Sequence, residues 1–180
     1  MIKKAICSLL LAAVCILSFA QMPRIPQRLA LVEIDSEIAG TMEHLEVFNM
    51  PENGVNQYFL ALGHLGFGDE IVQVLFDPVS ELFIPLGGTV AEALETMQSM
   101  QDLFKGDPDD SIELPGCLNI AFPNKERENV KITYMKPLLS RILRFSVQRE
   151  GYIRATHIQR SDFNSLVNGV KLYGKLHPKE

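Results

Sequence analysis

Two parts of this 180-residue sequence show the same order of signals, in which paired extended runs are followed by a helical pattern. In the first part, alternating apolar residues and an Asp-Pro turn predict a β-hairpin over residues 72–86. Thr89 and Glu92 then stand three apart as a capping box, and helical spacing of apolar residues continues over 90–104 until Gly106. This order predicts a sheet whose apolar face is covered by a helix.

The second part repeats the hairpin over residues 143–158. A three-residue loop, 149–151, ends in glycine and suits a type I turn followed by a bulge. In this register Phe145 pairs with Ala155, and both point toward the core. Because side chains alternate along a strand, the register also decides which polar residues share the opposite face.

A second helix is predicted after this hairpin, with Ser161 as its N-cap and Gly174 at its end. Further extended runs lie upstream of the hairpins, over 44–48, 57–62, 112–122 and 130–135. We therefore predict an α+β fold of antiparallel sheets with two helices, in which a module of several strands and one helix is repeated in tandem. The modules span 21–106 and 107–180 and pack as one compact unit. Residues 29–38 fit either a strand or a short helix.

The first twenty residues have the pattern of a secretory signal peptide. Two lysines precede a short apolar run, and small residues at positions 18 and 20 suit a cleavage site. We therefore predict an exported protein, in the periplasm or outside the cell, without a membrane span once the signal is removed. Removal would leave Cys117 as a lone thiol, and its apolar surroundings in the sequence predict a buried, structural cysteine.

Charge is unevenly distributed along the chain. Residues 21–124, the acidic part, have 3 basic and 17 acidic side chains, whereas residues 125–180, the basic part, have 12 basic and 5 acidic ones. This asymmetry indicates either an anionic or acidic partner for the basic part or an attraction between the two parts.

The second hairpin suggests where such a partner would bind. The predicted register places Arg144, Arg154 and Thr156 on the face opposite the core, where Lys131 of the preceding strand joins them. We predict that this basic face binds an anionic ligand or an acidic protein surface. The alternative is an ordinary solvated face, because antiparallel sheets commonly leave one face in water.

Motifs for catalysis or cofactor binding are absent from the sequence. The four histidines lack metal-binding spacing, and neither a Gly-x-Ser-x-Gly elbow nor a Gly-rich phosphate loop is present. His44 lies between Glu43 and Glu46, but a solvated position explains it more simply than a metal or acid–base role. His157 is predicted to point into the core. We therefore predict no catalytic residue, no metal and no cofactor, and the acidic total charge disfavours nucleic acid as a partner.

These observations predict a non-catalytic binding or accessory module. One alternative is a small hydrolase or thiol-dependent enzyme that uses Cys117 with a histidine. Another is a structural subunit of an envelope assembly that joins its partners through exposed sheet edges.

Overall fold

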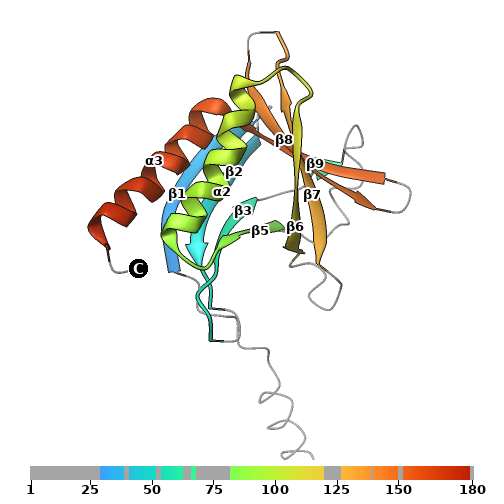
Figure 1. Ribbon diagram of the computed structural model, residues 1–180. Helices are drawn as coiled ribbons and strands as arrows, with labels where there is room; N and C mark the ends of the chain where they lie inside the picture. Colours follow the sequence, from blue (N-terminus) through green and yellow to red (C-terminus); the bar gives the residue numbers. More distant parts are fainter. Residues whose placement is uncertain are drawn as a thin grey trace, which may run out of the picture.

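The computed structural model describes residues 29–38, 41–51, 54–62, 66–67, 82–119, 127–138, 140–149 and 152–178. These residues form an antiparallel sheet with two α-helices on one side of it (Figure 1). The predicted α+β class is confirmed. The predicted signal peptide over 1–20 and most of the hairpin over 72–86 lie outside the described residues.

The strands follow one another across the sheet in nearly the order of the chain, β1-β2-β3-β5-β6-β7-β8-β9-β4. They are β1 (Leu29–Ile38), β2 (Thr41–Asn49), β3 (Tyr58–Leu62), the two-residue β4 (Gly66–Phe67), β5 (Leu82–Gly87), β6 (Ser111–Asn119), β7 (Glu128–Met135), β8 (Ile142–Arg149) and β9 (Tyr152–Gln159). The prediction of separate sheets is wrong, because β5 pairs with β6 through Leu82–Asn119 and Phe83–Leu118. This pairing removes two strand edges that would otherwise lie open.

Each half of the chain places four long strands before one helix. The strands β1, β2, β3 and β5 precede α2 (Val90–Asp102), and β6 to β9 precede α3 (Arg160–Leu176). Residues 29–38, which fit a strand or a helix, form β1 and pair along their length with β2. The shared order of elements agrees with the predicted modules, while their origin in a tandem repeat stays a prediction.

The start of α2 follows the predicted capping chemistry. The Glu92 backbone N–H donates to Thr89 Oγ1 at 3.2 Å, and Glu92 Oε2 accepts from the Gly88 N–H at 2.7 Å. These bonds satisfy backbone donors that a helix N-terminus leaves without intrahelical partners. The helix continues into a 3₁₀ turn, η1 (Leu103–Lys105), and the chain leaves it at Gly106.

The predicted ends of α3 are wrong. Gln159 precedes the helix and no side chain caps it, while Ser161 lies in the first turn and its hydroxyl donates to Asp162 Oδ1. The helix also passes through Gly174. Glycine serves close packing in this helix, because a Cβ at Gly169 would lie 2.7 Å from both Cγ atoms of Val32.

The predicted register of the second hairpin is wrong by one residue. Phe145 pairs with Thr156, and Arg149 pairs with Tyr152, so the loop has two residues where three were predicted. A shift of one residue exchanges the two faces of a strand. Thr156, 3% exposed, therefore lies on the core face of β9, and His157 lies on the opposite face.

The main core lies between the sheet and its helices. Alternate residues of the strands from β2 to β9 point into it, α2 packs against β5, α3 packs against β1, and the two helices contact each other. Phe104 of η1 closes one end through ring contacts with Tyr134 and Phe163. We call the sheet face opposite this core the outer face.

Candidate functional site

Two polar groups on the outer face are candidates for function. The first lies on β7, β8 and β9, in the basic part of the chain, and the second lies on β1 and β2, in the acidic part. Between them the outer face of the sheet carries a buried cluster of apolar side chains, which comprises Phe48, Met50, Phe59, Ala61 and Phe83. The basic group and the acidic group therefore lie apart on the same face of the sheet, with the apolar cluster between them.

The first group is built by strand pairing. Lys131 lies opposite Ser146, Thr133 lies opposite Arg144, and Arg144 in turn lies opposite His157. Side chains opposite each other on one face of an antiparallel pair have Cβ atoms about 4.5–5.5 Å apart. We call these five residues the polar sheet face; two of the predicted site residues, Lys131 and Arg144, belong to it.

The other two predicted site residues do not belong to it. Thr156 is buried on the core face, opposite the buried Phe145. Arg154 occupies the strand position opposite Val147, a core residue, so its register position is also on the core side. His157, which was predicted to point inward, lies on the outer face instead. The one-residue change of register causes all three differences.

Arg144 and His157 interact electrostatically. Burial, and then the positive charge of Arg144, lower the pKa of His157 below its ordinary value. His157 is therefore a neutral imidazole at neutral pH. Arg144 itself is half-buried, and its Nε is shielded from solvent without a hydrogen-bond partner. Buried donors of this kind carry a free-energy cost of about 1–3 kcal/mol or more until an acceptor meets them.

Cys117 lies on the other side of the sheet. It is fully buried in the main core, and its Sγ lies 3.7 Å from the carbonyl oxygen of Leu114. Burial, with a smaller contribution from Glu128, raises the pKa of the thiol to about 12. A thiol protonated at neutral pH is a poor nucleophile. The sheet also separates it from His44 and His157, which lie on the outer face.

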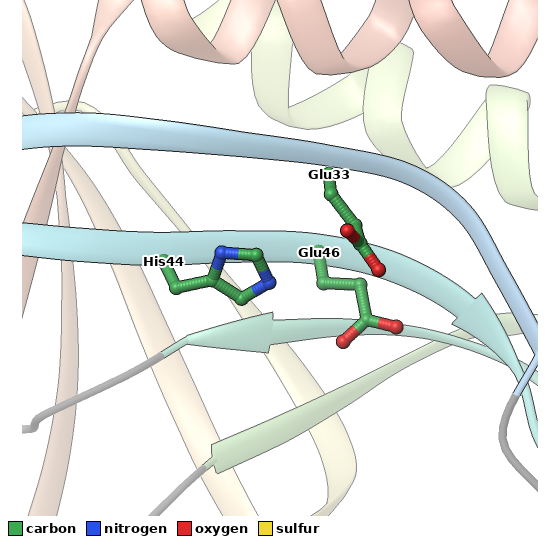
Figure 2. Close-up of side chains that lie close together, drawn as sticks. All are labelled: Glu33, His44 and Glu46. Carbon is green, nitrogen blue, oxygen red and sulfur yellow. The ribbon is translucent and has the colours of Figure 1, made fainter.

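The second group is a cluster of Glu33, His44 and Glu46 (Figure 2). Glu33 of β1 lies opposite Glu46 of β2, and one ligand atom from each of the three residues lies within 4.8 Å of the others. Asp35 lies opposite His44, and its Oδ1 is 3.1 Å from His44 Nδ1. We call these four residues the β1–β2 cluster.

Part of the β1–β2 cluster could be recognised in the sequence. His44 and Glu46 are two apart in a predicted strand, so they share a face. Glu33 and Asp35 were missed, because the strand β1 and its register with β2 were not predicted.

Comparison with known proteins gives no identification. No protein-family model, no curated protein and no solved structure matches the chain. Function must therefore be inferred from the two polar groups themselves. Among the described residues, no helix has the length and apolar character needed to cross a lipid bilayer.

Proposed function

We propose that this chain is an exported, non-catalytic binding or accessory protein that binds an anionic group on its polar sheet face. The ligand group is a phosphate or a carboxylate, carried by a small molecule or by an acidic protein surface. Arg144 is the central residue. His157 lies opposite it on β9, and Lys131 lies diagonally from it on β7.

The observation that carries this proposal is the state of Arg144. Its Nε has no hydrogen-bond partner and is shielded from water, although arginine is the side chain best suited to planar bidentate contact with carboxylate or phosphate. A bound anion would supply the missing acceptor and compensate the positive charge. No described ion pair takes up this charge in the free protein.

Neighbouring side chains extend the site. Lys131 is exposed and adds a second positive charge one strand away, while Thr133 offers a hydroxyl donor on the same face. The Ser146 hydroxyl already donates to the Lys131 carbonyl oxygen at 3.2 Å, so its proton is not available to the ligand in this arrangement. Glu113, opposite Lys131 on β6, bounds the positive region on its far side and accepts a hydrogen bond from Asn129.

The test is a titration of the purified chain with inorganic phosphate, followed by two-dimensional amide NMR. The proposal predicts saturable shifts confined to β7, β8 and β9, and their loss in Arg144→Gln. Arg141→Gln is the matched control, because Arg141 is an exposed arginine three residues earlier that lies outside the strand. Equal binding by the wild type and Arg144→Gln would refute the site.

A second titration distinguishes the source of the anion. A short peptide of glutamates presents several carboxylates, as an acidic protein surface does. Tighter binding of the peptide than of phosphate would favour a protein partner, because several weak contacts add when they are linked. Tighter binding of phosphate would favour a small ligand.

Export is a separate part of the proposal. It is supported by the charged, apolar and small-residue segments of the first twenty residues. Expression in a bacterial host and mass measurement of the protein recovered from the periplasm or the medium tests it. The proposal expects a mature chain that begins at Gln21, whereas an intact leader on the recovered protein would contradict it.

The rival functions have less support. The buried, protonated Cys117 disfavours a thiol-dependent enzyme. An assembly subunit joined through sheet edges would show a mass in solution above that of one chain.

Superposition of the two modules, residues 56–105 on 129–174, tests the proposed tandem repeat, and a failure to match strand for strand would refute it.

A further inference from the structure

The β1–β2 cluster brings three metal-ligating side chains together from two strands. Glu33 and Glu46 are directly opposite each other, and His44 is two residues before Glu46 on the same strand face. Their ligand atoms lie within 4.8 Å of one another. Figure 2 shows the His44 ring and the carboxylates of Glu33 and Glu46 close together beside the two strands.

Asp35 prepares His44 for coordination. A carboxylate accepts hydrogen bonds, so the 3.1 Å contact between Asp35 Oδ1 and His44 Nδ1 places the imidazole proton on Nδ1. The lone pair is then on Nε2, the nitrogen available to a metal. This carboxylate–histidine arrangement is the usual second layer of protein metal sites, where it fixes the tautomer and the orientation of the ring.

The geometry needs only a small closure to hold an ion. Two ligands of a tetrahedral zinc ion, each about 2.1 Å from the metal, are about 3.4 Å apart. The side chains of the cluster must therefore approach one another by roughly 1 Å or more. Glu33 and His44 are exposed, and the hydrogen bond to Asp35 orients the His44 ring, whereas Glu46 is 4% exposed. The buried Glu46 carboxylate and the oriented imidazole define the site, and adjustment of the exposed Glu33 side chain closes it onto the ion.

We propose that Glu33, His44 and Glu46 form a binding site for a divalent transition-metal ion of the Zn²⁺ class, with Asp35 as a positioning residue. The imidazole selects this class, because Ca²⁺ and Mg²⁺ take oxygen ligands almost exclusively. Three protein ligands leave at least one position for water or another ligand. The exposure of Glu33 and His44 places that position toward solvent.

Charge supports the assignment. Glu33, Asp35 and Glu46 bring three carboxylates onto adjacent positions of two strands, and Glu46 is buried beside the aromatic residues of the outer face. A divalent cation is attracted to carboxylates gathered in this way. The site shares no residue with the polar sheet face, so it does not depend on the proposed anion binding.

The experiment is a Zn²⁺ titration of the purified full-length chain without a polyhistidine tag, measured by calorimetry and by imidazole ¹⁵N NMR. We expect one saturable site and a shift of the His44 Nε2 resonance. His44→Gln and Glu33→Gln should each weaken binding about tenfold or more, and both residues are exposed, so the variants should fold. His177→Gln, an exposed histidine after α3, is the matched control and should bind as the wild type does.

Two further measurements separate the proposal from non-specific binding. Asp35→Asn should weaken Zn²⁺ binding about tenfold and change the tautomer signal of His44 in the free protein, a change that a purely structural role would not produce. Ca²⁺ and Mg²⁺ at equal concentration should leave Zn²⁺ bound. Unchanged affinity in His44→Gln, absence of saturable binding, or displacement of Zn²⁺ by Ca²⁺ would each overturn the proposal.

Discussion

Replacement of Gly169 by alanine tests how closely α3 packs on the sheet. The new Cβ would lie 2.7 Å from Val32 Cγ1 and Cγ2, whereas carbon atoms in contact are normally about 3.5–4.0 Å apart. Val32 cannot easily turn aside, because a β-branched side chain has few χ1 rotamers. The helix and β1 must therefore separate by about 1 Å.

Two opposing contributions determine the change in the free energy of unfolding. Alanine stabilises a helix interior by about 0.8–1.0 kcal/mol relative to glycine. Overpacking of a tight contact typically costs about 1–3 kcal/mol. The net effect expected for Gly169→Ala is a destabilisation of up to about 2 kcal/mol.

A double-mutant cycle isolates the contact. Val32→Ala removes both Cγ atoms, so Gly169→Ala in that background should be stabilising by about 1 kcal/mol. Urea unfolding followed by far-ultraviolet circular dichroism measures all four proteins. The coupling between positions 32 and 169 should equal the overpacking cost, about 1–3 kcal/mol. If Gly169→Ala stabilises the wild type as much as it stabilises Val32→Ala, the described packing of α3 on β1 is wrong.

Three further predictions concern the core, the hairpin register and pH. Cys117 should resist thiol reagents in the native protein and react after denaturation, as mapped by mass spectrometry; rapid native labelling would contradict its burial. Thr156→Lys should destabilise the fold by several kcal/mol because it buries a charge, whereas Ala155→Lys should be tolerated. Urea unfolding measures both variants, and the reverse result would support the register with a three-residue loop. Because the pKa of His157 is lowered in the folded state, protonation of this group in the unfolded state lowers the free energy of unfolding as pH falls below about 6.5. His157→Gln should flatten that part of the stability–pH profile. Equal profiles for the wild type and His157→Gln would contradict the shift.

Local signals in the sequence predicted much of the fold. Thr89 and Glu92 lie at the start of α2 with the expected hydrogen bonds, and alternating runs located most of the long strands. These signals act between residues close in sequence, so neighbouring side chains and backbone preferences are sufficient to identify them.

The errors arise where distant packing decides the structure. The Arg-Glu-Gly sequence at 149–151 is compatible with loops of two or three residues, and the difference moves Thr156 from one face of β9 to the other. Gly174 has the character of a helix stop, but its lack of a Cβ accommodates Val90 of α2, whose Cγ1 would lie 3.0 Å from that Cβ.

The candidate sites also show the difference between local signals, which the sequence reveals, and long-range pairing, which it does not. Lys131 and Arg144 were recognised because β7 and β8 alternate clearly and pair as neighbours in the chain. Glu33 was missed because its place beside Glu46 depends on the register of β1 with β2, and β1 becomes a strand through pairing and through packing against α3. Local pattern alone leaves this segment ambiguous.

The most direct test of the proposed function is the pKa of His157, measured by NMR titration of its imidazole with and without saturating phosphate. The account predicts a value below the ordinary one in the free protein, and a clear rise when the anion lies between Arg144 and His157. An unchanged pKa at a phosphate concentration that saturates the protein would contradict anion binding on this face.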